Sequence, residues 1–116
     1  ETAETQVQNN EIVMVKTDYQ TLVVKLDNIL YIEGLKDYIK IFTSQNIKPI
    51  ITLNSLKKLQ QNLPAKRFSR IHKSYIVGLE HIKAINKTQV LINDRHIPIG
   101  ESYKGIFMNQ LDEMRI

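Results

Sequence analysis

Short runs of β-branched and aromatic residues alternate with turn-forming residues along most of the chain. Between positions 12 and 53 these runs are separated by Asp, Asn, Gly and Ser. Short strands at this spacing predict an antiparallel β structure with tight connections. The predicted strands lie at residues 12–15, 22–26, 29–32, 38–42, 47–53, 68–77, 82–85, 89–92 and 95–99.

Two segments depart from the strand pattern and predict helices. Leu56, Leu59 and Leu63 fall on one face at helical spacing, with Asn54 as a candidate N-cap and Pro64 as the stop. From Ser102 onward, apolar residues recur at near-helical spacing, at positions 106, 107, 111 and 114. We therefore expect a mainly β fold of small antiparallel sheets packed together, with one short helix in the middle and a short C-terminal helix.

The first eleven residues have a different composition from the rest. Residues 1–10 contain one large apolar side chain, Val7, so they bury too little surface to offset the entropy lost on ordering. We interpret residues 1–11 as a flexible linker and residues 12–116 as a single domain. Because the chain begins with Glu1 rather than Met, we expect a longer protein with a further N-terminal domain.

Charge is distributed unevenly along the chain. Residues 1–11 carry three glutamates and no basic side chain, whereas residues 12–116 carry 16 basic and 9 acidic side chains, a net charge of +7. Between Lys57 and Lys83 there are seven Lys or Arg residues and Glu80 as the one acidic residue. A basic domain behind an acidic leader favours a polyanionic partner, most often a nucleic acid.

No catalytic or metal-binding pattern is recognisable, so we expect neither an enzyme nor a cofactor. The chain has no cysteine, and its histidines at positions 72, 81 and 96 follow no metal-ligand spacing. Ser74 lies two residues from His72, with no acidic residue placed to orient that histidine as in a hydrolase triad. No apolar run approaches the roughly eighteen residues of a membrane span. A cytoplasmic protein is the expectation.

The segment from Phe68 to Val77 concentrates side chains suited to a nucleic acid. If it continues as a strand, Arg70, His72 and Ser74 share one side and could donate to phosphate oxygens or base edges. The alternative is an edge strand that its charges protect from aggregation. The residues alone favour neither interpretation.

Six motifs in order resemble the LytTR family of DNA-binding domains, and they extend from about residue 12 to residue 111. They are Tyr31-Ile32-Glu33, Lys36-Asp37-Tyr38, Ser55-Leu56 through Leu63-Pro64, the block from Phe68 to Val77, Ile97-Pro98-Ile99-Gly100, and Ser102-Tyr103-Lys104. The resemblance implies sequence-specific binding of double-stranded DNA by loops between strands, which enter successive major grooves. It also implies the output domain of a bacterial two-component response regulator, behind a receiver domain phosphorylated by a sensor histidine kinase. Such domains pair as dimers on direct repeats in promoters.

The resemblance implies that two loops of this chain contact DNA. In the first loop, Lys36, Asp37 and Tyr38 match the family pattern; Lys36 suits phosphate, while Tyr38 either donates through its hydroxyl or packs its ring in the core. In the second loop, Arg70, His72, Lys73 and Ser74 match a DNA-contacting block. Arg70 and His72 are expected near phosphate and Lys73 at a base edge or phosphate. For His72 the alternative is a structural hydrogen bond that holds the loop.

A third loop departs from the family pattern. Where many relatives have Ser-Arg, this chain has Gly100-Glu101, so a guanine-reading arginine is replaced by a side chain that only accepts, for instance from a cytosine amine. Either this loop reads another base, or Ser102, Tyr103 and Lys104 anchor the backbone instead. The family's Asn after Ile-Val is replaced by Gly78, which we expect to alter a turn rather than the function.

Two other functions compete with duplex recognition. A protein-interaction module could use the basic residues to dock an acidic surface, but the interleaving of basic residues with Ser74 and Tyr75 suits groove contacts better. Single-stranded RNA binding would need exposed aromatic platforms, and Phe42, Phe68 and Phe107 lie in apolar runs instead. Duplex DNA is the favoured partner.

Overall fold

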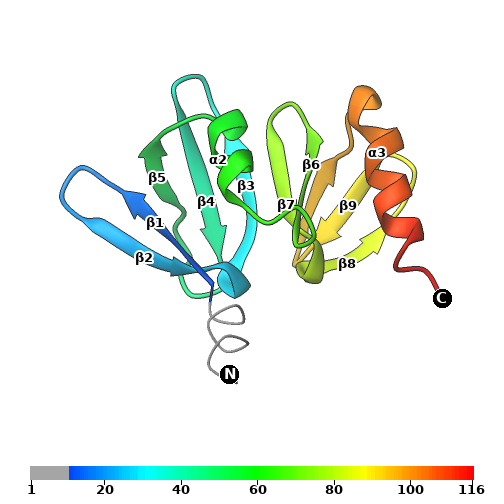
Figure 1. Cartoon of the computed structure of the whole chain (residues 1–116), viewed down its shortest axis with the longest axis horizontal. Helices are drawn as coiled ribbons and strands as arrows, with labels where there is room; N and C mark the ends of the chain where they lie inside the picture. The colour runs from blue at the N-terminus through cyan, green and yellow to red at the C-terminus, as the bar shows by residue number, and fades with distance from the viewer. Residues whose placement is uncertain (1–10) are drawn as a thin grey trace.

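Three antiparallel sheets form the fold, as the alternation of short runs and turns predicted (Figure 1). The computed structural model of the protein describes residues 11–116, so the predicted linker lies outside the described residues except for Glu11. The central sheet has the order β5–β4–β3–β7–β6, with β3 (Ile29–Gly34), β4 (Tyr38–Thr43), β5 (Ile50–Leu53), β6 (Phe68–His72) and β7 (Tyr75–Gly78).

The two smaller sheets flank the central sheet. One is a hairpin of β1 (Ile12–Lys16) and β2 (Thr21–Lys25), and the other has the order β10–β9–β8, with β8 (Ile82–Ile85), β9 (Gln89–Ile92) and β10 (Arg95–Pro98). The helices are η1 (Leu26–Asn28), α2 (Leu56–Asn62), η2 (Leu79–His81) and α3 (Glu101–Asp112). No helix within residues 11–116 is long and apolar enough to cross a membrane.

The central sheet buries both of its faces against separate cores. On one face Ile32, Ile39 and Ile41 pack with the hairpin β1–β2 and with the leucines of α2. On the other face Tyr31 and Val77 pack with the β8–β10 sheet and α3. Successive residues of a strand point to opposite faces, so each central strand feeds both cores.

Three details of the predicted elements are wrong. The N-cap of α2 is Ser55, whose hydroxyl accepts the Lys58 amide at 3.2 Å, and not Asn54. The strand predicted at residues 47–53 begins only at Ile50. The segment predicted as one strand at residues 68–77 is a hairpin, with a turn at residues 73–74 and a register shift between Arg70 and His72. The predicted alternation of sides therefore stops at this irregularity.

Gly78 allows the close approach of two backbone segments. A Cβ atom at this position would lie 2.7 Å from the Ile29 carbonyl oxygen and 3.3 Å from that of Leu30. Because both contacts are backbone atoms, Gly78→Ala is expected to lower the free energy of unfolding by about 1–3 kcal/mol, measured by urea denaturation. Gly105→Ala is the matched control: a Cβ there meets nothing within 4 Å, so alanine should stabilise α3 by about 0.5–1 kcal/mol. Equal effects at both positions would contradict this reading.

Arg67 joins three carboxylates beside the two short 3-10 helices. Its guanidinium pairs with Glu11 at 3.3 Å, with Glu80 at 2.8 Å and with Asp27. The hydrogen bond to Glu80 raises the pKa of Arg67 above its usual value, with Asp27 adding to the effect against the cost of partial burial. Arg67 thereby connects η1, η2 and the residue that precedes β1.

Candidate nucleic-acid interface

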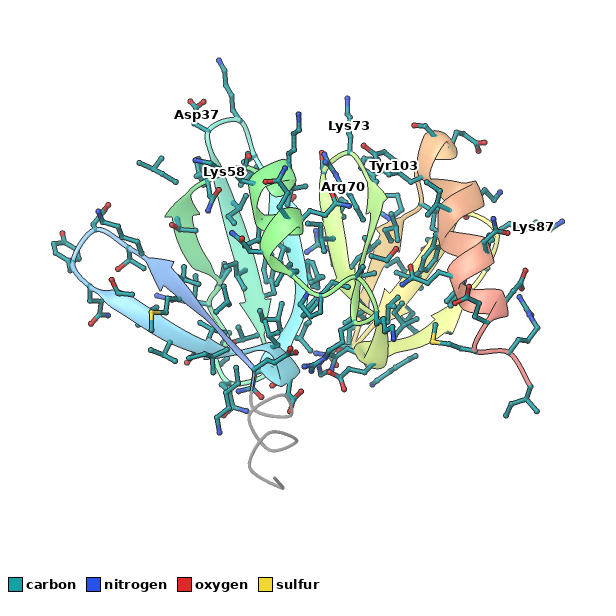
Figure 2. All side chains as sticks on the ribbon, viewed as in Figure 1. Asp37, Lys58, Arg70, Lys73, Lys87 and Tyr103 are labelled. Carbon is teal, nitrogen blue, oxygen red and sulfur yellow. The ribbon has the colours of Figure 1, made fainter. Side chains whose placement is uncertain are left out.

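The three loops expected to contact DNA lie along one edge of the molecule. Residues 35–37 connect β3 to β4, residues 73–74 connect β6 to β7, and residues 99–102 lead from β10 into α3. Figure 2 shows Asp37, Lys73 and Tyr103 along this upper edge. We call these three segments together the loop edge.

Backbone hydrogen bonds fix the three loops relative to one another. The Gly34 amide donates to the Ser74 carbonyl at 2.8 Å, which joins the end of β3 to the β6–β7 turn. The Gly100 amide donates to the Ile71 carbonyl at 2.7 Å, which joins the start of α3 to β6. Residues separated by up to 40 positions are therefore held in one fixed arrangement. A preformed set of loops can recognise a ligand without an entropic cost of ordering.

Arg70 and His72 shape the β6–β7 turn from inside. Arg70 donates from Nη2 to the Lys73 carbonyl at 2.7 Å and from Nε to the His72 carbonyl at 3.4 Å. Its guanidinium also lies 5.5 Å from the centre of the Tyr103 ring. The Ser74 amide donates to Nδ1 of His72 at 3.0 Å, so the neutral ring carries its proton on Nε2. These contacts agree with the structural alternative for His72 and give Arg70 a similar task.

Other predicted site residues lie at the surface of the same edge. Lys73 is exposed at the tip of its turn, and Lys36 and Asp37 are exposed at the tip of theirs. Within residues 11–116 none of these three forms an ion pair. Tyr38 is 36% exposed and pairs with Leu53, which is 79% exposed, so its ring lies at the surface and not in the core. The tips of both loops therefore offer polar and charged groups to a ligand.

In the third loop, Gly100 packs closely against the side chains of Tyr103 and His72. A Cβ atom at Gly100 would lie 3.3 Å from Cδ2 of Tyr103 and 3.4 Å from Cδ2 of His72. Glu101 is exposed in the first turn of α3, where a negative charge stabilises the helix dipole. Ser102 is also exposed. Glu101 thus serves the helix and remains accessible to a ligand.

The lysines of α2 belong to this edge as well, although their sequence pattern only indicated a solvated helix face. Leu56 packs so closely on Gly34 that a Cβ atom there would lie 2.8 Å from the leucine side chain. The first turn of α2 therefore lies beside the end of β3, and Figure 2 shows Lys58 below Asp37 in this view. Lys57 and Lys58 are both exposed. Only the tertiary packing of Leu56 could reveal this placement.

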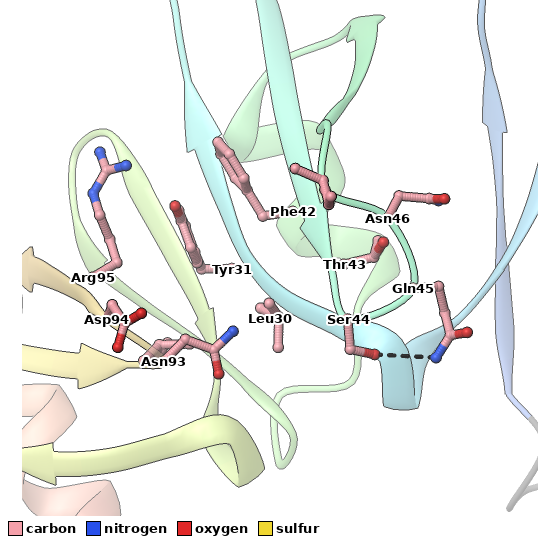
Figure 3. A pocket seen from close by; sticks show the side chains of 12 residues that line it. Leu30, Tyr31, Phe42, Thr43, Ser44, Gln45, Asn46, Asn93, Asp94 and Arg95 are labelled. Atoms are coloured by element: carbon pink, nitrogen blue, oxygen red, sulfur yellow. Dashed lines mark hydrogen bonds between the residues drawn. The ribbon is translucent and has the colours of Figure 1, made fainter.

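A cleft of about 500 Å³ lies away from the loop edge (Figure 3). Tyr31 and Phe42 stack on its wall with ring centres 4.4 Å apart, and Arg95 lies 5.8 Å from the centre of the Tyr31 ring. Burial raises the pKa of the Tyr31 hydroxyl, and Arg95 opposes that rise. Within residues 11–116 no three His, Asp or Glu side chains are grouped to hold a metal ion.

The fold is a small β domain that presents the polar and charged tips of three loops along one edge. The family model for the LytTR DNA-binding domain matches residues 19–112. The chain therefore belongs to the LytTR family of DNA-binding domains, which is not a catalytic family. The fold and family expected from the six motifs are confirmed.

A solved structure supports the same assignment. The chain is similar to the LytTR DNA-binding domain of a protein described as a methyl-accepting/DNA response regulator from Bacillus cereus, with a TM-score of 0.75 and 25% sequence identity. The alignment covers 86% of this chain and 95% of that one. No curated protein sequence matches the chain.

Proposed function

We propose that the chain binds double-stranded DNA in a sequence-specific manner by inserting the loop edge into major grooves, and so regulates transcription. The observation that carries this proposal is the joining of three loops by backbone hydrogen bonds along one edge, in a member of a DNA-binding family. The longest dimension of the domain is 42 Å, and one helical turn of DNA is about 34–36 Å. The domain is therefore long enough to lie across two successive major grooves on one face of a duplex.

Each residue of the loop edge has a role in this proposal. Lys73 reads a base edge or holds a phosphate at the tip of its turn, which Arg70 and His72 shape. Lys36 and Lys104 contact phosphates, and Asp37 and Glu101 can accept hydrogen bonds from cytosine amines. The remaining contacts come from the hydroxyl groups of Tyr38, Ser74 and Ser102.

The proposal extends to the protein in which the domain works. The description of the Bacillus cereus relative as a response regulator supports the output domain of such a regulator, which would work in the cytoplasm. In that arrangement a receiver domain, phosphorylated by a histidine kinase, promotes pairing of two output domains on direct repeats in a promoter. Mass spectrometry of the full-length protein, with and without a phosphate donor, tests that assignment.

The test of DNA binding is a titration of the chain into a labelled duplex with a candidate direct repeat. The titration is run at two salt concentrations, with a scrambled duplex as the control. The proposal expects affinity that falls steeply with salt and a preference for the repeat. If the chain binds no duplex at low salt, the DNA proposal is wrong, and the loop edge becomes a candidate surface for an acidic protein.

Lys58→Gln is expected to weaken binding to the repeat and to the scrambled duplex by the same factor. The reason is that the proposed orientation on DNA brings the exposed Lys58 close to a phosphate. A plot of log affinity against log salt should become shallower by about 0.9, the slope of one lost phosphate contact.

Lys25→Gln is the matched control for charge. Lys25 is exposed at the end of β2, and η1 and β3 separate it from the loop edge. It should leave the salt slope unchanged, although it removes the same charge. If both variants give the same slope, total charge rather than position explains the effect of Lys58.

A further inference from the structure

The tip of the β1–β2 hairpin presents an aromatic side chain that packs on nothing in its own domain. The Thr17 amide and hydroxyl both donate to the Gln20 carbonyl, at 2.8 Å and 3.0 Å, and the Gln20 amide returns a bond to the hydroxyl at 3.3 Å. This turn holds Asp18 and Tyr19 at the apex, where Tyr19 is 95% exposed. An exposed ring on a well-ordered turn is suited to anchor a contact between proteins.

A groove at the other end of the molecule has dimensions and chemistry that suit such a ring. It measures about 490 Å³ and lies between the β8–β9 loop and the C-terminal half of α3. The apolar part of its lining is Ile85, Met108, Leu111 and Met114. Methionine and leucine side chains adapt to a partner, and methionine sulfur packs favourably against aromatic rings.

The hairpin tip carries an acidic residue, and the groove has a basic residue that could pair with it. Asp18 precedes the exposed ring at the hairpin tip, and Lys87 lies at the rim of the groove. Within residues 11–116, neither Asp18 nor Lys87 forms an ion pair. Arg115, the other basic residue of the groove, is already paired with Asp112 at 2.9 Å. Lys87 is therefore the natural partner of Asp18.

We propose that the hairpin tip of one copy of this chain docks into the α3 groove of the next copy. The two surfaces lie at opposite ends of the longest axis, the hairpin at the left and α3 at the right of Figure 1. A contact between two different surfaces is heterologous, so copies join head to tail instead of closing into a symmetric pair. The loop edge lies between the two ends and stays uncovered (Figure 2).

The contact is small and therefore weak. One ring with its neighbours buries much less than the roughly 1,200–2,000 Å² of a stable interface, so association takes place at high micromolar to millimolar concentration. Two copies bound close together on one DNA duplex would reach such a concentration locally. The contact itself does not depend on DNA binding, and its test uses the chain alone.

Sedimentation velocity over a range of concentrations up to millimolar tests the proposal. The average mass of the parent chain should rise continuously past that of a dimer. Tyr19→Ser removes the aromatic ring from the tip, and Met114→Glu places a carboxylate in the apolar groove, where it also repels Asp18. Each variant is expected to weaken association about tenfold or more. Both side chains are exposed, so the thermal unfolding midpoints should match that of the parent.

Mixing the two variants distinguishes this contact from any symmetric one. The Tyr19→Ser chain keeps its groove and the Met114→Glu chain keeps its tip, so an equimolar mixture should form a one-to-one pair and nothing larger. Ile51→Ser, which removes an exposed apolar side chain elsewhere, should associate like the parent. A parent that stays monomeric at millimolar concentration, or a mixture that stays monomeric, overturns the proposal. Neither result affects the duplex titration.

Discussion

Phe107→Ala is expected to lower the free energy of unfolding by about 3–5 kcal/mol. Phe107 is fully buried in the core between α3, the central sheet and the β8–β10 sheet, where it packs with Ile71, Val77 and Ile97. Removing the ring leaves a cavity that three separate elements would have to close. Because small domains are stable by only about 5–15 kcal/mol, much of that margin would disappear.

Urea denaturation of the variant and the parent measures this effect. Ile106→Ala is the control. Ile106 is the neighbour of Phe107 on the same helix, but its side chain is 75% exposed, so this substitution should change the free energy of unfolding by less than about 0.5 kcal/mol. A loss below 1 kcal/mol for Phe107→Ala would show that α3 contributes little to the core. The start of α3 is bonded to β6, so the variant should also weaken DNA binding by loosening the third loop.

Lys73→Ala is expected to reduce discrimination between the direct repeat and a scrambled duplex by about 1–3 kcal/mol. Its side chain extends from the tip of a turn whose carbonyl oxygens are held by Arg70, so the ammonium group is presented in a fixed place. Parallel titrations of the two duplexes at one salt concentration measure the loss.

The pattern of loss across the two duplexes separates two roles for Lys73. A larger loss on the repeat means that Lys73 reads a base, whereas an equal loss on both duplexes would move it to the phosphate backbone. Lys25→Ala, remote from the loop edge, should leave both affinities close to those of the parent. If Lys73→Ala binds both duplexes like the parent, the β6–β7 turn does not contact DNA.

The strands and sheets could be predicted from the sequence because strands that are buried on both faces have a regular pattern of apolar residues. Ile32, Ile39 and Ile41 alternate with residues that face the second core, and turn-forming residues separate the runs. The helix cap was harder to place, because Asn54 and Ser55 are both good caps in adjacent positions. Ser55 takes the extended backbone conformation directly before α2 and is therefore the cap of this helix.

The loop edge was predicted only in part, because its contacts join residues far apart in the sequence. The motifs located the three loops, but they did not show that Arg70 and His72 hydrogen-bond within their own turn; the contacts of these residues with phosphate stay a prediction. A register shift between them changes which way each side chain points. Lys58 joined the edge through the packing of Leu56 on Gly34, a contact that no local pattern encodes.

The cluster around Arg67 has a mechanical consequence for the domain. Glu11 immediately precedes β1, while Asp27 and Glu80 belong to the short helices that lead into β3 and β8. A pull on the chain ahead of Glu11 is therefore shared through one guanidinium with the bases of two different sheets.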